Sequence, residues 1–274
     1  MIERNITRRG VIRSVAAGVG VVAPAASADI VGAARAQSAS KAFLLIHGTY
    51  CGGWIWRRAS DLLEKQGHKV FSPTLTGLGE RSHLLRKDIS LDTQVTDIVN
   101  VIKWEDLRDI CLVAHSYGGW IGSGALEQIG ERVSSIVWLD AFKPENGQKP
   151  VDFTNEVFRK AVLDAAEKGE PGFPVPGGKL GPVWVNEKDS AYVSSKLTPH
   201  PVGTYLQPIA LSGARDKVAK KTYIRATRFP SPVFDKALAE CKTDKSWSTF
   251  EIASGHNLML DAPERLTELL LQAS

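Results

Sequence analysis

Residues that could do chemistry are concentrated around Ser116, where an apolar run that starts at Cys111 ends in Ala-His-Ser-Tyr-Gly-Gly. A strand that turns abruptly into a helix holds its serine in a strained conformation, so bulky side chains two residues away would collide with backbone. Ala114 and Gly118 meet this demand, giving AxSxG where GxSxG is usual. We predict that Ser116 is a nucleophile that attacks a carbonyl carbon; the alternative is a serine that only caps the helix.

The serine needs a base, because its hydroxyl is a poor nucleophile until a nearby group takes its proton. His256 is the predicted base, since it follows the last apolar strand and keeps the chain order serine, acid, histidine. Gly255, directly before it, allows a sharp turn. The alternative for His256 is a histidine in a surface loop. The other five histidines lie at predicted strand ends, in polar loops or between prolines: His47, His68, His83, His115 and His200.

The acid that orients the histidine has two candidates. Asp140 stands at the carboxyl end of the strand that follows the nucleophile, where a side chain can reach the same histidine from a neighbouring strand. The segment after the strand predicted at 222–226 contains no carboxylate before Asp235, which comes late. We therefore expect Asp140 to be the acid, with Asp235 as the substitute if Asp140 only caps the loop that follows it.

The reaction also needs hydrogen-bond donors aimed at the oxygen that becomes negative in the tetrahedral intermediate. Two backbone amides fit: that of Tyr117, at the start of a helix, and that of Thr49, after the first strand. The glycine-rich stretch 51–53 lacks the Lys-Ser/Thr pair of a phosphate loop. We expect no cofactor and no metal. The three cysteines lack CxxC spacing and define neither a disulfide framework nor a zinc site: Cys51, Cys111 and Cys241.

Short apolar strands that alternate with helical stretches must position these residues, and this pattern predicts an α/β fold. We expect the α/β-hydrolase architecture, a mainly parallel six-stranded sheet with helices on both faces. The predicted strands are 42–47, 69–73, 110–115, 135–140, 222–226 and 249–253. The predicted helices are 55–66, 91–103, 117–129, 235–241 and 263–272, with Asp261 as the N-cap of the last one.

The interval 146–218 breaks this alternation with several prolines and glycines, and it contains Phe153, Phe158, Phe173 and Trp184. We interpret it as a cap inserted over the ends of the strands, which would shape a substrate pocket. The alternative is a surface excursion packed by its own aromatic residues. The cap belongs to one hydrolase domain predicted at 37–274.

Residues 1–36 have the composition of an export signal. Arg8 and Arg9 are adjacent, and an apolar stretch of small residues follows at 15–26, which resembles a twin-arginine signal peptide. Small residues at Ala34 and Ala36 suit cleavage before Gln37, so we expect a periplasmic or secreted protein without a stable membrane anchor. The alternative is a disordered tail. Three of the four net positive charges fall in residues 1–36, and a nearly neutral remainder does not suggest nucleic acid as a partner.

Four segments together resemble the plant methylesterase and hydroxynitrile lyase branch of the α/β-hydrolases and its bacterial esterase-like relatives. They are His-Gly-Thr-Tyr-Cys-Gly-Gly-Trp at 47–54, Pro-Thr-Leu-Thr-Gly-Leu-Gly at 73–79, His-Ser-Tyr-Gly-Gly at 115–119 and Gly-His-Asn-Leu-Met at 255–259. The resemblance implies a cofactor-free enzyme with a helical cap. It places Ser116 and His256 at the positions of the catalytic pair, and Thr49 and Tyr117 at those of the oxyanion hole.

The sequence departs from this family at two places. The plant members usually carry their acid after the strand that here ends at Thr227, whereas we expect Asp140. Hydroxynitrile lyases of this branch have a lysine after the catalytic histidine, whereas this chain has Asn257 and lacks a cation to stabilise departing cyanide. We expect hydrolysis of a small carboxylic ester through an acyl-enzyme. The alternatives are a hydroxynitrile lyase-like enzyme and a non-catalytic protein that binds a small ligand on the same fold.

Overall fold

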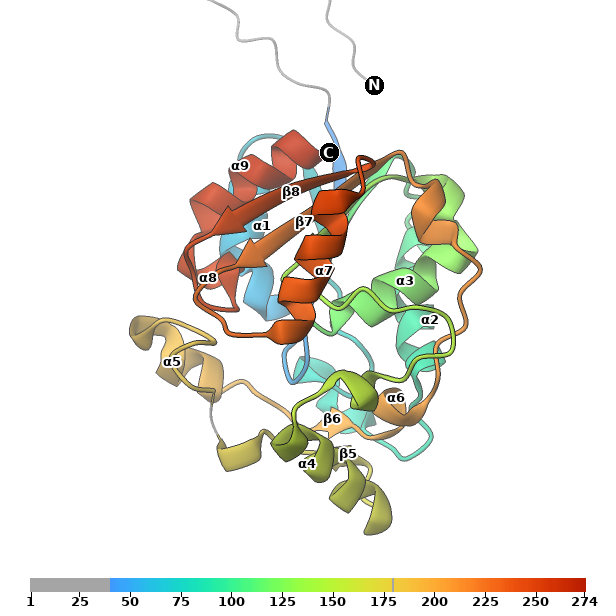
Figure 1. Cartoon of the computed structure of the whole chain (residues 1–274), viewed down its shortest axis with the longest axis vertical. Helices are drawn as coiled ribbons and strands as arrows, with labels where there is room; N and C mark the ends of the chain where they lie inside the picture. Colours follow the sequence, from blue (N-terminus) through green and yellow to red (C-terminus); the bar gives the residue numbers. More distant parts are fainter. Residues whose placement is uncertain (1–39, 179) are drawn as a thin grey trace, which may run out of the picture. The chain divides into compact units, whose positions relative to one another are not determined.

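A six-stranded parallel sheet forms the centre of the computed structural model, which describes residues 40–178 and 180–274. The predicted signal peptide at 1–36 lies outside the described residues. The strand order is β2-β1-β3-β4-β7-β8. The last two strands, β7 and β8, lie side by side (Figure 1). The strands are β1 (Ala42–Ile46), β2 (Lys69–Phe71), β3 (Ile110–His115), β4 (Val133–Leu139), β7 (Lys220–Ala226) and β8 (Trp247–Ile252). The predicted fold class is confirmed, and each predicted strand is present within two residues at its start and end.

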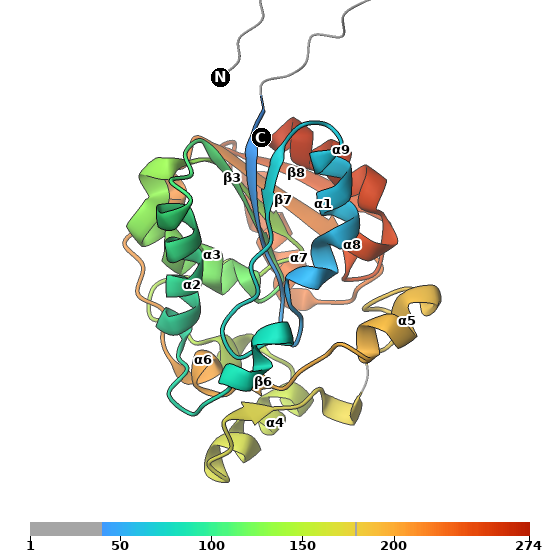
Figure 2. The ribbon, with the colours of Figure 1, turned by 180° about the vertical axis from the view of Figure 1, so that it is seen from behind.

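The central strands are apolar along their length because both faces of the sheet are covered. All six residues of β3 are buried, and in the parallel register Ala114 pairs with Trp138 of β4, which pairs with Tyr223 of β7. One apolar core lies under α2 (Leu91–Trp104), α3 (Gly118–Ile129) and α7 (Pro232–Thr243). A second lies on the other face, under α1 (Arg57–Glu64) and α9 (Pro263–Ala273) (Figure 2). Packing on both faces fixes the register, and therefore the height at which each strand ends.

The helices α2 and α7 begin at residues whose side chains accept a hydrogen bond from a free backbone amide. Ser90 and Thr93 form a capping box at the start of α2, and Ser231 caps α7. The predicted N-cap role of Asp261 is wrong, because Ala262 precedes the last helix and Asp261 binds the backbone amides of other loops. The helices are α1 (Arg57–Glu64), α2 (Leu91–Trp104), α3 (Gly118–Ile129), α7 (Pro232–Thr243), α8 (Leu258–Asp261) and α9 (Pro263–Ala273).

The segment between β4 and β7 contains short elements of its own (Figure 1). They are α4 (Glu156–Glu167), β5 (Gly172–Phe173), α5 (Glu187–Ser194), β6 (His200–Pro201) and α6 (Gly203–Leu206). β5 and β6 form a small antiparallel pair. Phe173 and Tyr205 from this segment are buried against Tyr50 and Tyr117, which follow the ends of β1 and β3. The segment therefore packs at the carboxyl edge of the large sheet. Among the described residues, no helix combines the length and apolar character that crossing a bilayer requires.

Candidate active site

Ser116 occupies the tight turn between β3 and α3 in a left-handed conformation, with φ of 55°. Its amide donates to the carbonyl of Leu139, and its own carbonyl accepts from the amides of Gly119 and Phe142. These bonds hold a conformation that costs a non-glycine residue about 1 kcal/mol or more. A Cβ on Gly118 would lie 2.9 Å from the carbonyl oxygen of Ile46. The backbone of β1 is therefore too close to this position for any residue other than glycine.

The structure brings Ser116, His256 and Asp140 together from the ends of three strands. Nε2 of His256 lies 2.8 Å from Oγ of Ser116, and Nδ1 lies 2.5 Å from Oδ2 of Asp140. An ionised carboxylate only accepts hydrogen bonds, so Nδ1 carries the ring proton and Nε2 is free to accept the serine hydroxyl. All three residues are buried.

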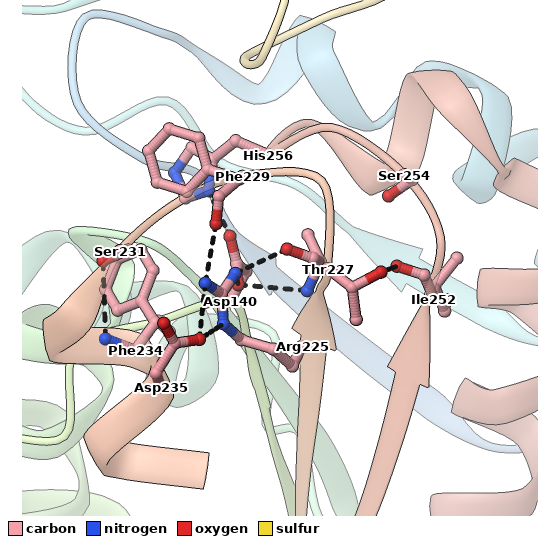
Figure 3. Close-up of polar contacts among 12 residues, drawn as sticks. Asp140, Arg225, Thr227, Phe229, Ser231, Phe234, Asp235, Ile252, Ser254 and His256 are labelled. Carbon is pink, nitrogen blue, oxygen red and sulfur yellow. Dashed lines mark hydrogen bonds and ion pairs between the residues drawn. The ribbon is translucent and has the colours of Figure 1, made fainter.

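Asp140, rather than Asp235, contacts His256 (Figure 3). The second carboxylate oxygen of Asp140 accepts from the amide of Ala226, 3.1 Å away, and from the guanidinium of Arg225, 2.6 Å away. Asp235 lies on α7 with its side chain 63% exposed and pairs with the other edge of the same guanidinium. Both candidate acids therefore bind Arg225, on opposite sides of it.

Aromatic side chains enclose the imidazole of His256. Phe229 stacks on it with ring centroids 4.3 Å apart, Phe234 lies nearly parallel at 5.6 Å, and Trp184 meets it edge-on at 5.0 Å. Nε2 of His115 donates to the carbonyl of His256 over 2.9 Å, which fixes the backbone of the histidine loop. The ring is therefore held in an orientation in which both nitrogens already have partners.

Sequence reasoning missed Arg225 and the aromatic enclosure of the histidine. The available signal for Arg225 was a charged residue inside the apolar strand Thr-Tyr-Ile-Arg-Ala, because a buried charge demands a partner. Gly255 was expected to allow a sharp turn, but its φ does not lie in the left-handed region. Glycine is needed there because a Cβ would lie 2.8 Å from Asp261 and 3.0 Å from the carbonyl oxygen of Val183.

The two predicted oxyanion donors lie beside Ser116. Tyr117 follows the serine directly and is the N-cap residue of α3, and the loop before Thr49 is so close that a Cβ on Gly48 would lie 3.0 Å from Cβ of Ser116. Within the described residues, neither the amide of Thr49 nor that of Tyr117 donates to another protein group. The hydroxyl of Thr49 bonds to that of Tyr205 over 2.6 Å. Both amides are thus available to a developing oxyanion.

His47 positions the loop that carries Thr49. Its Nδ1 donates to the carbonyl of Gly48, and its Nε2 accepts from the amide of Leu75. Burial lowers the pKa of His47 to about 4, so the ring is neutral and can serve as donor and acceptor at once. Burial also lowers the pKa values of His115 and His200.

Side chains of the types that bind metals do not form a cluster in the part of the chain that the structure describes. Among residues 40–178 and 180–274, no group of three His, Cys, Asp or Glu side chains is arranged to hold a metal ion. The three cysteines are buried as free thiols, and burial raises the pKa of Cys51 and Cys241 to about 12 and that of Cys111 to about 11. These thiols are therefore protonated at neutral pH and are poor nucleophiles.

A parallel sheet covered on both faces, with a strained serine after a central strand and a histidine after the last one, defines the class of α/β-hydrolases. Comparison with known proteins places the chain in this class as well. The chain belongs to the alpha/beta hydrolase family, whose model matches residues 43–269.

The chain is also similar to individual proteins of known name. The chain is 34% identical to the carbendazim hydrolyzing esterase of Nocardioides sp. (strain SG-4G), over 83% of this chain and 97% of that protein. It is 26% identical to putative methylesterase 11, chloroplastic, of Arabidopsis thaliana, over 84% of this chain and 63% of that protein. Among solved structures, an extracellular alpha/beta-hydrolase from a Paenibacillus species matches with a TM-score of 0.75 at 21% identity, covering 85% of this chain and 99% of that one.

Proposed function

We propose that the protein is a serine hydrolase that cleaves a small carboxylic ester through an acyl-enzyme, with Ser116 as nucleophile, His256 as base and Asp140 as the acid that orients it. The observation that carries this proposal is the unbroken hydrogen-bond path from Oγ of Ser116 through the imidazole to Asp140, with distances of 2.8 Å and 2.5 Å. Nucleophile, base and orienting acid in this geometry are the requirement for acyl transfer by serine.

The mechanism follows from the hydrogen bonds. His256 accepts the hydroxyl proton at Nε2 as Oγ of Ser116 attacks the ester carbonyl, and Asp140 stabilises the imidazolium that forms. The amides of Thr49 and Tyr117 donate to the carbonyl oxygen as it becomes negative. The imidazolium then gives its proton to the leaving alcohol, and a water activated by His256 releases the acid from Ser116.

The relatives support hydrolysis of an ester. The relative from Nocardioides is named an esterase that hydrolyses carbendazim, and the relative from Arabidopsis is named a putative methylesterase. The aromatic residues around His256 and Thr49, which include Phe229 and Tyr205, favour a substrate with a small aromatic or alkyl group.

Steady-state hydrolysis of short-chain aryl and methyl esters, with carbendazim in the same panel, tests this function. We expect turnover by the wild type and a loss of kcat on the order of 10³-fold or more in Ser116→Ala, His256→Ala and Asp140→Asn. The matched control is Asp235→Asn, which changes the exposed carboxylate on the far side of Arg225 and should keep kcat within about tenfold.

Three outcomes would contradict the proposal. Wild-type protein without turnover on any ester would remove the esterase assignment. Release of one acyl equivalent per chain without further turnover would favour a ligand-binding protein on this fold. Activity that survives Asp140→Asn but not Asp235→Asn would move the acid to Asp235.

A further inference from the structure

Arg225 is a buried cation at the end of β7, and its side chain is only 3% exposed. A buried guanidinium is costly unless each N–H finds an acceptor. Nη1 donates to Oδ1 of Asp140 and to the carbonyl of Ala226, over 2.6 Å and 2.5 Å. Nη2 donates to the carbonyl of Phe229 over 2.6 Å and lies 2.8 Å from Oδ1 of Asp235, and Nε donates to the same oxygen over 2.9 Å. Four N–H groups of Arg225 thus donate hydrogen bonds, and Nη2 also forms an ion pair with Asp235.

The first consequence concerns Asp140, which is fully buried. Its Oδ1 is held by Arg225 and by the amide of Ala226, which leaves Oδ2 directed at His256. Rotation of the carboxylate would break these two bonds. The positive charge of Arg225 also offsets the cost of burying an ionised carboxylate.

The second consequence concerns the chain that leaves β7. Arg225 binds the carbonyl of Phe229, in the turn after β7, and the carboxylate of Asp235, in the first turn of α7. It therefore links the turn to the start of the helix (Figure 3). That same stretch presents Phe229 and Phe234 to His256, and the guanidinium lies 5.9 Å from the ring centre of Phe234. One side chain therefore contacts both the carboxylate partner of His256 and the segment that supplies its aromatic cover.

We propose that Arg225 is a positioning residue for the reaction. Its hydrogen bonds orient Asp140 toward His256 and hold the segment 226–235, which carries Phe229 and Phe234, against the imidazole. Its charge disfavours proton uptake by the Asp140–His256 pair. It touches no reacting atom and acts through Asp140. The inference rests on the proposed function for its kinetic part only, because the orientation and protonation of His256 can be measured without a substrate.

The other titratable groups around the pair are Tyr223 on β7, His115 on β3, and the carboxylates of Asp235 and Asp261. Burial raises the pKa of Tyr223 and lowers that of His115, so both are neutral near pH 7. Arg225 is therefore the cation bound directly to Asp140 among the described residues. Removing it should make the pair take up a proton more readily, whichever of the two residues holds that proton.

The experiment compares Arg225→Met, which keeps the apolar stem without the charge, and Arg225→Lys, which keeps the charge without the planar fork. Arg215→Met is the matched control, because Arg215 is also buried but binds Pro144 and Glu145, outside the site. The readouts are kcat and KM on an aryl ester, the pH of the acid limb of kcat/KM, and the titration of the His256 ring by NMR in protein labelled with ¹⁵N-histidine. The His256 resonances are assigned by their loss in His256→Ala.

We expect Arg225→Met to lower kcat at least tenfold with little change in KM, and to raise the pH at which the Asp140–His256 pair takes up a proton. Arg225→Lys should lower kcat but leave the titration midpoint near that of the wild type, since the charge remains. Arg215→Met should change neither. If Arg225→Met does not fold, Arg225→Lys decides through the same readouts.

Wild-type kcat and an unchanged His256 spectrum in Arg225→Lys, or an unchanged midpoint in a folded Arg225→Met, would overturn the inference. Loss of activity no larger than in Arg215→Met would do the same, because it would leave only a contribution to stability. If no ester is hydrolysed but the NMR midpoint moves as expected, the proposed function fails while the positioning role of Arg225 stands.

Discussion

Ser116 and Asp140 share a left-handed backbone conformation, with φ of 55° and 44° at the ends of neighbouring strands. In each case a backbone hydrogen bond to the next strand stabilises this conformation. The amide of Ser116 donates to the carbonyl of Leu139, and the amide of Asp140 donates to the carbonyl of Ile224 over 2.7 Å. In this conformation both side chains point toward His256 and form hydrogen bonds with its ring. The geometry of the candidate site therefore depends on how closely the loops after β3 and β4 pack.

Gly119 is where this packing is tightest. A Cβ there would lie 2.0 Å from the carbonyl oxygen of Phe142, a backbone atom that cannot turn aside. We expect Gly119→Ala to shift the loop after β4, lower the free energy of unfolding by about 2 kcal/mol or more, and reduce kcat strongly. Urea unfolding and ester turnover measure both effects.

Gly130→Ala is the control for this prediction. Gly130 ends the same helix with helical φ and ψ, and a Cβ there would find its nearest neighbour 4.0 Å away. The change should leave activity intact and be neutral or slightly stabilising. Equal destabilisation by the two substitutions would contradict the packing argument for Gly119.

Single residues differ in how far the sequence alone could place them. Ser116 and His256 were predicted because each lies in a short pattern tied to a strand end, and strand order alone favoured Asp140 over Asp235. Arg225 was not predicted, because its role depends on a contact between β7 and the residue after β4 that no local pattern encodes. The structure places Asp140 against His256, and its role as the acid remains for the proposed variants to test.

At the scale of elements, the sheet and its flanking helices could be predicted, whereas the elements of the inserted segment could not. Buried parallel strands are continuous apolar runs, and α2 and α9 have clear helical periodicity. Within 146–218, α4 and α5 are capped by Asn155 and Asn186, but their apolar faces are short and the strands β5 and β6 have two residues each. Contacts with the body, rather than local propensity, define these elements.

Asp261 joins this inserted segment to the histidine loop. Its carboxylate accepts from the amide and side chain of Asn186 and from the amide of Gly255, and the amide of His256 donates to the carbonyl of Val183. We expect Asp261→Ala to loosen both loops, which should lower Tm by several degrees and speed proteolytic cleavage within 180–190.

Glu264→Ala is the matched control, because Glu264 is an exposed carboxylate in the next helix turn. It should change Tm by less than about 2 °C. Limited proteolysis with mass spectrometry locates the cut sites. If Asp261→Ala is cleaved in the same pattern as the wild type, the hydrogen bonds of Asp261 do not hold the inserted segment in place.

At the scale of the whole molecule, we propose that residues 1–36 direct export through the twin-arginine route. We expect Arg8→Lys combined with Arg9→Lys to leave the precursor in the cytoplasm, because paired arginines are the defining feature of such signals. The control is Arg13→Lys, which changes an arginine outside the pair in the same segment. Cell fractionation with N-terminal sequencing measures the outcome, and a mature chain that starts elsewhere than Gln37 would refute the predicted cleavage site.

The buried histidines make the stability of the whole molecule depend on pH. His47 titrates at about pH 4 in the folded state but near its ordinary value of about 6.5 when unfolded, so the unfolded chain binds more protons between these two values. The stability contributed by neutral His47 is therefore complete above about pH 6.5 and is lost as the pH falls toward 4. Between pH 7.5 and 5.0 this loss amounts to about 2 kcal/mol for His47 alone.

We expect the free energy of unfolding in urea to fall less between pH 7.5 and 5.0 in His47→Gln than in the wild type, by about that 2 kcal/mol. The glutamine variant should be less stable than the wild type at pH 7.5, because it disturbs the bonds to Gly48 and Leu75, so the difference between the two pH values is the quantity to compare. His83→Gln, in an outer turn of the chain, should match the wild type at both pH values. If all three proteins lose the same free energy, His47 is not the group whose protonation opposes folding, and the acid sensitivity must be sought at His115 or His200, which are buried beside the same loops.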